Sequence, residues 1–245
     1  MKYLNELTKL KVFSYNDLID IIKNSNLAKV TLQNYMKKGY IKRIKHNLYS
    51  IISLETNEII ASKFLIASKI TETSFISHHS AFEFYGYYNQ VYNMVDVSSI
   101  SKFNNFSFEG NDYFLINTGL DCYVSEIRGV RVSSIERTIV DSIKDSGKYS
   151  DIEETLKCIQ LIPYISIKDI LNYLNLINSK ILYKKVGVIL SLFKNKFNIP
   201  DSFFNTCHNL SDSVVGYFDK SKLNEYNAEW KIYIYKGLEN LIKKE

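Results

Sequence analysis

The chain has 245 residues, 46% hydrophobic and 23% charged, a composition typical of a soluble globular protein that buries a sizeable core. No stretch approaches the roughly 18 consecutive apolar residues of a membrane span, and the start "MKYLNELTKLKVF" lacks the continuous apolar run of a signal peptide. Three widely spaced cysteines without a CxxC pair argue against a zinc site or a disulfide framework. We therefore expect a cytoplasmic protein with no membrane partner.

Positive charge is concentrated at the N-terminus. Residues 1–52 hold ten lysines or arginines and three acids, a local charge of +7. The whole chain carries +5, which leaves −2 for the other 193 residues. Such asymmetry indicates a nucleic-acid-binding domain, residues 1–52, joined to a nearly neutral body.

The first 52 residues predict three helices and a hairpin. Apolar residues from Tyr3 to Val12 follow a helical spacing, and Ser14 with Asp17 predicts the capped start of a second helix that ends in a turn at 24–26. A third helix should run from about residue 27 to 38 and stop at Gly39. Two short apolar runs then flank Asn47, which tolerates the left-handed turn of a β-hairpin.

The third helix should present a polar, cationic face that contains no acid. Its inward residues are expected to be Leu32, Tyr35 and Met36, whereas a face built only for solvation usually mixes both charges. The residues expected to face outward are Lys29, Thr31, Gln33, Asn34, Lys37 and Lys38.

Three helices followed by a basic hairpin describe a winged helix-turn-helix, whose third helix enters the major groove of duplex DNA while the wing touches phosphates. Gln33 and Asn34 are candidates to pair with adenine edges, and Thr31 to contact a thymine methyl group. The cations expected in the wing are Lys42, Arg43, Lys45 and His46. The alternative is a lysine-rich surface that reflects only the codon bias of a low-GC genome.

Residues 58–245 predict a larger α+β domain. A helix is expected over about 58–70, then a brief strand and a helix that is capped near Ser77 and closed by Gly86. Strands with turns at Gly110 and Gly129 should form a small, mostly antiparallel sheet. Helices dominate from about residue 133, and two strands return near the end.

The run "SSIERTIVDSI" carries the strongest local signals of this domain. Ser133 and Glu136 have the spacing of a capping box, and Arg137 and Asp141 can pair at i,i+4 on one helix face. These ties can simply stabilise a helix start. They can also mark functional residues, so Glu136, Arg137 and Asp141 are candidates for the activity of the larger domain.

Known catalytic and cofactor motifs are missing from the sequence. It contains no GxGxxG, P-loop, G-x-S-x-G or HExxH pattern. His78 and His79 are adjacent and point in different directions, and no third metal ligand follows at a usual spacing. We expect a protein that is not an enzyme and that holds no metal or cofactor.

Three stretches, in the same order, resemble the AbiEi antitoxins of type IV (AbiE-type) toxin–antitoxin systems. They are "TLQNYMKKGYIKRIKHNLYSI", "FISHHSAFEFYGYYN" and "VRVSSIERTIVDSI". The resemblance implies a bacterial antitoxin that represses its own operon by binding inverted repeats in the promoter. It also implies a cognate nucleotidyltransferase-like toxin, which the C-terminal domain neutralises, in this family commonly without a stable complex.

Two other functions remain open. A ligand-responsive winged-helix regulator without a toxin partner would use the larger domain to bind an effector. An enzyme that chemically disables the toxin would use Arg137 and Asp141 as its candidate residues.

Overall fold

The computed structural model describes residues 2–219 and 224–241, and its contacts divide the chain into two compact units. Unit 1 comprises Met1–Ile76, Asn93–Asp121 and Glu126–Val132. Unit 2 comprises Ser77–Tyr92, Cys122–Ser125 and Ser133–Glu245. The expected boundary between residues 52 and 58 lies inside unit 1 and stays a prediction.

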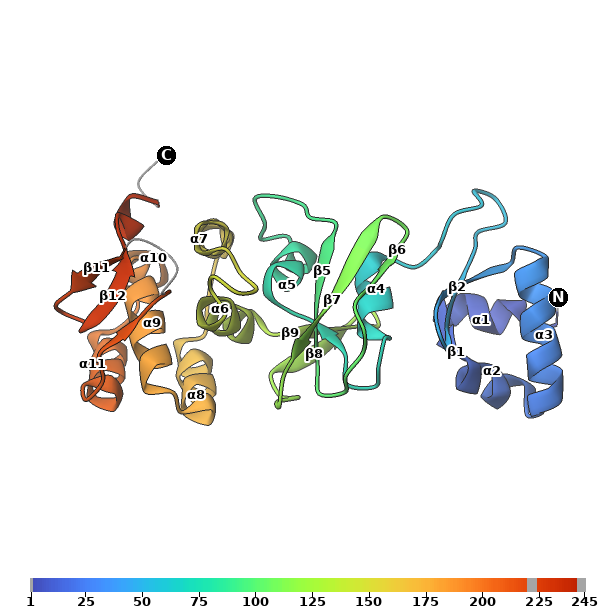
Figure 1. Ribbon diagram of the computed structural model, residues 1–245, viewed down its shortest axis with the longest axis horizontal. Coiled ribbons are helices and arrows are strands. Elements are labelled where there is room, and N and C mark those ends of the chain that lie inside the picture. The colour runs from blue at the N-terminus through green and yellow to red at the C-terminus, as the bar shows by residue number, and fades with distance from the viewer. Residues whose placement is uncertain (1, 220–223, 242–245) are drawn as a thin grey trace. The chain divides into compact units, whose positions relative to one another are not determined.

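Unit 1 begins with a winged helix-turn-helix fold. Its elements are α1 (Leu4–Leu10), β1 (Val12–Ser14), α2 (Tyr15–Ile22), α3 (Ser25–Lys37), β2 (Ile41–Lys45) and β3 (Leu48–Ile51). The three strands form an antiparallel sheet in the order β1-β3-β2, and the three helices gather on one face of it (Figure 1). Burial of Leu7, Phe13 and Leu18 between helices and sheet provides the hydrophobic driving force.

Capping and turn residues in the sequence predicted most of these element boundaries correctly. The Ser14 hydroxyl accepts a hydrogen bond from the Asp17 amide, and the Asp17 carboxylate accepts one from the Ser14 amide, which completes the expected capping box. Two details of the sequence prediction were wrong. Val12, expected to continue the first helix, begins the strand Val12–Ser14, and α3 begins at Ser25 with Asn24 as its cap, where a turn over 24–26 was expected.

The rest of unit 1 is built on a mixed six-stranded sheet, with the order β6-β7-β5-β4-β9-β8. Its elements are α4 (Lys63–Ser68), β4 (Phe75–Ile76), β5 (Met94–Ser99), β6 (Phe106–Phe108), β7 (Asn111–Asn117), β8 (Val124–Ile127) and β9 (Val130–Ser133). The β5–β7 and β4–β9 pairs are parallel, so this sheet is mixed rather than mostly antiparallel. The expected helix over 58–70 shortens to α4, because Ser62 caps it.

Unit 2 contains most of the helical second half. Its elements are α5 (His78–Tyr85), α6 (Ile135–Lys144), α7 (Ile152–Leu161), α8 (Ile167–Ile177), α9 (Lys180–Ser191), α10 (Lys194–Phe197), α11 (Asp201–Ser211), β10 (Gly216–Tyr217), β11 (Asn224–Asn227), β12 (Ile232–Tyr235) and a 3-10 turn at Leu238–Leu241. The three C-terminal strands form a small sheet in the order β10-β12-β11 (Figure 1). The α+β class with a helical second half is thus confirmed. Within the described residues no helix is long and apolar enough to cross a membrane.

Candidate nucleic-acid interface

Helix α3 has one buried face and one exposed face. Ala28, Thr31, Leu32 and Tyr35 are buried at the i, i+3, i+4, i+7 spacing that fixes a helix on its core. The exposed face carries the cations and amides Lys29, Gln33, Asn34, Lys37 and Lys38 together with the apolar side chains of Leu27, Val30 and Met36, and none of the residues of α3 is acidic. Two predicted orientations were wrong: Thr31, expected to face outward, is buried, and Met36, expected to face inward, is exposed. Thr31 is therefore not placed to contact a thymine methyl group.

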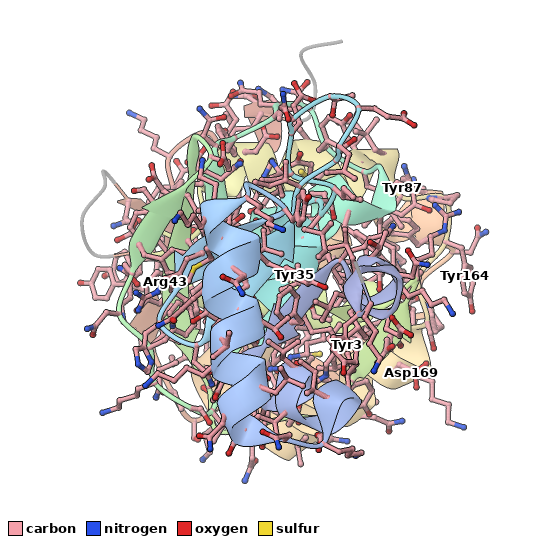
Figure 2. All side chains as sticks on the ribbon, turned by 90° about the vertical axis from the view of Figure 1, so that its right-hand side faces the viewer. Tyr3, Tyr35, Arg43, Tyr87, Tyr164 and Asp169 are labelled. Carbon is pink, nitrogen blue, oxygen red and sulfur yellow. The ribbon has the colours of Figure 1, made fainter. Side chains whose placement is uncertain are left out.

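Tyr35 anchors the inward side of α3 through contacts with two other tyrosines. The backbone amide of Tyr3 donates to the Tyr35 hydroxyl at 3.4 Å, and the Tyr35 ring meets the ring of Tyr40 edge-on at 5.8 Å. Figure 2 looks onto α3 and shows Tyr3 and Tyr35 to one side of the helix and Arg43 of the wing to the other. The outward face of α3 is therefore presented by a helix that is anchored along its inward side.

The wing is the hairpin β2–β3 with Lys45-His46-Asn47 at its tip. Lys45 pairs with Leu48, and the register shifts between Arg43 and Lys45. Asn47 has a φ of 61°, which confirms the expected left-handed turn residue, and its side-chain oxygen accepts a hydrogen bond from the Tyr15 amide at 3.0 Å. This bond ties the tip of the wing to the start of α2.

Helix α3 and the tip of the wing share one surface. Lys29, Gln33 and Met36 of α3 line the same hollow as His46 and Asn47 of the wing. Two of these side chains are cationic or can become so, and two are amides. A phosphate backbone and base edges would meet these groups together, which is the arrangement that a winged helix-turn-helix uses on duplex DNA.

Two wing cations are engaged by other residues of unit 1. The Lys42 amine pairs with the Glu109 carboxylate, and both side chains are about half exposed. The Lys45 amine lies over the rings of Phe103 and Phe106, at 5.1 and 5.4 Å from their centroids, and partial burial lowers its pKa. The cations of the wing are therefore not equally available: Arg43 and His46 are exposed, whereas Lys42 and Lys45 have partners.

Of the candidates in the larger domain, Arg137 and Asp141 lie in the interior of unit 2 and Glu136 is half-buried. Arg137 and Asp141 form the expected i,i+4 ion pair at 3.1 Å, and both side chains are almost completely buried. The Arg137 guanidinium also donates to the Cys122 carbonyl oxygen, and Asp141 accepts hydrogen bonds from the Tyr173 hydroxyl and the Lys144 amine. This buried network holds α6 to α8.

The capping prediction at the start of α6 was wrong in its residues. Ser134, not Ser133, accepts from the Arg137 amide, because Ser133 is the last residue of β9 and its hydroxyl contacts Thr138. The Glu136 carboxylate accepts from the Ser166 amide at 3.0 Å, so it stabilises the start of α8 instead of its own helix.

Neighbouring cations set the protonation of Asp141. Burial alone would raise the pKa of this carboxyl, but Lys144, His78 and Arg137 together lower it below its ordinary value. Asp141 is therefore a carboxylate at neutral pH. An ionised acid saturated with donors stabilises structure, and it differs from a general acid or base, which needs a pKa near the operating pH.

The whole fold has a counterpart among solved structures. The crystal structure of the RV2827C protein from Mycobacterium tuberculosis matches with a TM-score of 0.63 at 12% sequence identity, over 95% of this chain and 90% of that one. The likeness shows a shared fold over nearly the whole of both chains. No protein-family model matches the sequence, and no curated protein matches it either.

Proposed function

We propose that this chain is an AbiEi-type antitoxin that represses its own operon. Its winged helix-turn-helix would bind inverted repeats in the promoter, and the rest of the chain would neutralise a nucleotidyltransferase-like toxin. The observation that carries the proposal is the outward face of α3, which holds cations and amides, lacks acids and adjoins the wing tip in one hollow. The proposal assigns no catalytic step to the chain.

The antitoxin half is supported by the three stretches that resemble AbiEi proteins. Each of them covers consecutive elements of the chain: α3 with the wing, β4 followed by α5, and β9 followed by α6. The polar residues of the third stretch, Arg137 and Asp141, are buried and paired. Their role in the proposed antitoxin is to build the domain that acts, and a direct contact of these two side chains with a toxin is not required.

Base readout would fall to Gln33 and Asn34. Both amides are exposed on α3, and each amide that pairs with an adenine edge contributes about 1–3 kcal/mol of discrimination. The test measures binding to a duplex taken from upstream of the chain's own gene and to a scrambled duplex. The wild type should prefer the first, and Gln33→Ala/Asn34→Ala should bind both duplexes nearly equally. Equal binding of both duplexes by the wild type would remove the repressor role.

Toxin neutralisation needs a separate assay. The product of the neighbouring nucleotidyltransferase-like gene should arrest growth when expressed alone, and co-expression of this chain should restore growth. A variant with Lys29, Lys37 and Lys38 changed to Ala should restore growth as well as the wild type, because the DNA-binding face is not needed. Continued arrest with the wild type present would refute the antitoxin half of the proposal.

A further inference from the structure

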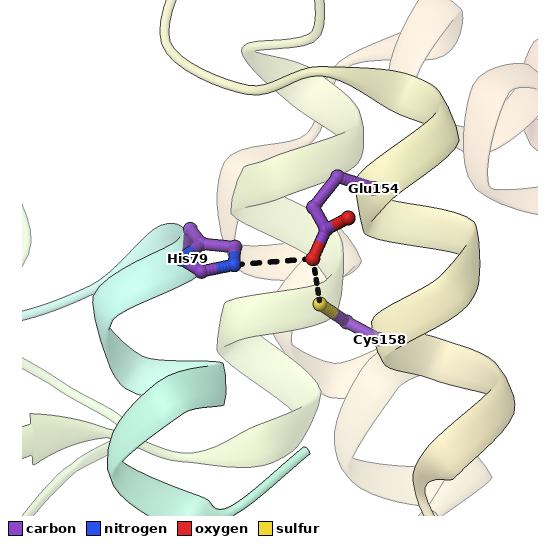
Figure 3. Close-up of side chains that lie close together, drawn as sticks. All are labelled: His79, Glu154 and Cys158. Carbon is purple, nitrogen blue, oxygen red and sulfur yellow. Dashed lines mark hydrogen bonds and ion pairs between the residues drawn. The ribbon is translucent and has the colours of Figure 1, made fainter. Parts of the chain in front are cut away.

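Three side chains of types that commonly bind transition metals lie close together in unit 2. His79 comes from the first turn of α5, and Glu154 and Cys158 lie one turn apart on α7 (Figure 3). The i,i+4 spacing places the glutamate and the cysteine on one face of their helix. Because 75 residues separate His79 from Glu154, sequence spacing could not reveal this neighbourhood.

Two of the three separations between ligand atoms suit a tetrahedral zinc ion. His79 Nε2 lies 3.3 Å from Glu154 Oε1, Cys158 Sγ lies 3.7 Å from the same oxygen, and all three atoms lie within 4.8 Å of one another. With Zn–N and Zn–O near 2.0 Å and Zn–S near 2.3 Å, neighbouring ligand atoms of a tetrahedral site are about 3.3–3.6 Å apart. A small approach of the histidine nitrogen and the cysteine sulfur would complete three corners of such a site.

The surroundings hold the ligands in place. Glu154 Oε1 accepts hydrogen bonds from the Asn89 and Gln90 amides at 3.3 and 3.2 Å, and Oε2 accepts one from the Asn89 side chain at 3.4 Å. The Tyr92 ring lies 4.4 Å from the His79 ring. Outer partners of this kind orient metal ligands, and their loss weakens metal binding in known sites.

The chemical types of the three ligand atoms favour zinc over other common ions. One nitrogen, one oxygen and one sulfur suit Zn²⁺, whereas Ca²⁺ and Mg²⁺ prefer oxygen ligands alone. The side chains of Cys158 and Glu154 are buried, and that of His79, at 14%, is the most exposed of the three. The fourth position would be filled by a water molecule that enters from the histidine side.

We propose that His79, Glu154 and Cys158 bind one zinc ion, with water in the fourth position, and that the ion fastens α5 and the 89–92 segment to α7. On binding, the S–H bond of Cys158 breaks, the sulfur becomes a zinc ligand and its proton passes to solvent. His79 donates from Nε2 to Glu154 in the metal-free protein, so Nε2 also loses its proton to solvent and Nδ1 takes one up from solvent, which leaves the ring neutral and Nε2 free to bind the ion. This site is independent of DNA binding and of the proposed antitoxin activity.

In the metal-free protein the cysteine is a thiol. Burial and the neighbouring Glu154 carboxylate raise the pKa of Cys158 to about 12, and the thiol donates to Glu154.

The test uses the full chain, stripped of metal with a chelator and titrated with Co²⁺ and then Zn²⁺. One equivalent of cobalt should produce a sulfur-to-cobalt charge-transfer band with the visible bands of a tetrahedral ion, and zinc should abolish both. Cys158→Ser should lose the charge-transfer band and bind zinc roughly 100-fold or more weakly, a larger loss than removal of an outer partner causes. Cys207→Ser is the matched control, because Cys207 is equally buried in α11 and lies outside the cluster.

Thermal unfolding gives a second readout, the shift of the unfolding midpoint on addition of zinc. Zinc should raise the unfolding midpoint of the wild type, since a ligand that binds only the folded state stabilises it, and His79→Gln should reduce that shift. Failure of the wild type to bind one equivalent of either metal would overturn the proposal. So would a charge-transfer band that survives in Cys158→Ser, or one that is lost in Cys207→Ser.

Discussion

At the scale of single residues, the Asp141 carboxylate collects donors from two helices. Arg137 and Lys144 of α6 donate at 3.1 and 2.8 Å, and the Tyr173 hydroxyl of α8 donates at 3.1 Å. The Arg137 side chain is fully buried, so its charge depends on this carboxylate for compensation. Removal of either member of the pair leaves the other charged in a medium that solvates it poorly.

We predict that Asp141→Ala lowers the free energy of unfolding by about 3–5 kcal/mol, because the buried Arg137 charge loses its partner. Lys144→Met is the matched control. The Lys144 side chain is 38% exposed, and its loss should cost about 1 kcal/mol or less. Chemical denaturation of the three proteins measures both values, and equal losses for the two variants would contradict this reading of the network.

The same carboxylate should make stability depend on pH. Because the folded state lowers the pKa of Asp141, its contribution is complete above the ordinary aspartate pKa of about 3.9 and is lost as the pH falls through the folded value. The difference in unfolding free energy between the wild type and Asp141→Asn should therefore narrow below about pH 4. A difference that stays constant from pH 6 to pH 2.5 would argue against an ionised Asp141.

At the scale of elements, the wing is restrained by contacts within unit 1. Lys42 pairs with Glu109, so part of the charge needed for a phosphate contact is already neutralised. An exposed ion pair is worth roughly 1 kcal/mol or less, which corresponds to a factor of up to about five in affinity.

Glu109→Gln should therefore strengthen binding to duplex DNA by up to about fivefold and steepen the log–log salt dependence by about 0.9, because one more cation reaches a phosphate. Glu126→Gln removes one exposed acid from the same unit without touching Lys42, and it should leave both quantities nearly unchanged. Fluorescence anisotropy with a labelled duplex at several salt concentrations measures them. Identical effects of the two substitutions would mean that Glu109 acts only through net charge.

Helix α9 offers a test of packing in unit 2. A Cβ on Gly187 would overlap the ring of Trp230, which is 2% exposed and stacked at 3.9 Å on His208. Alanine normally stabilises a helix by about 1 kcal/mol relative to glycine, yet Gly187→Ala should destabilise the protein by about 1–3 kcal/mol through overpacking. Gly119→Ala is the control, since its Cβ meets open space at an ordinary φ. A higher free energy of unfolding for Gly187→Ala than for the wild type would show that the Trp230 ring moves aside at little cost.

The predictions that succeeded were those with a local cause. The Ser14–Asp17 capping box, the left-handed Asn47 and the Gly86 helix end each depend on a few neighbouring residues, so the sequence displays them directly. Errors arose where tertiary contacts decide. Residues 12–14 become a strand because β3 pairs with them, and Thr31 points inward because the core of unit 1 lies on that side of α3.

Groups of residues from distant segments could not be predicted from the sequence. His79, Glu154 and Cys158 come together only because α5 and α7 pack in the same unit. The alternation of apolar and polar residues likewise does not reveal that two strand pairs of the central sheet are parallel. The neighbours of Lys42 and Lys45, which limit the wing, belong to segments about 60 residues away along the chain.

At the scale of the whole molecule, charge is divided unequally along the chain. The first 52 residues carry a net charge of +7 and the other 193 residues carry −2, which gives the whole chain +5. Within that segment Lys29 and the wing tip border one hollow, Lys37 and Lys38 are exposed at the end of α3, and two lysines of the wing are held by other residues. In the proposed repressor the main electrostatic contact with DNA would therefore come from Lys29, Lys37 and Lys38 rather than from Lys42 and Lys45.

The salt dependence of binding to duplex DNA tests this assignment most directly. Changing Lys29, Lys37 and Lys38 together to Ala should reduce the log–log slope by up to about 2.7, since each lost phosphate contact removes about 0.9. Three exposed lysines elsewhere, Lys102, Lys168 and Lys180, changed together to Ala, should leave the slope as it is in the wild type. A slope that is the same for the wild type and the α3 variant would contradict the account.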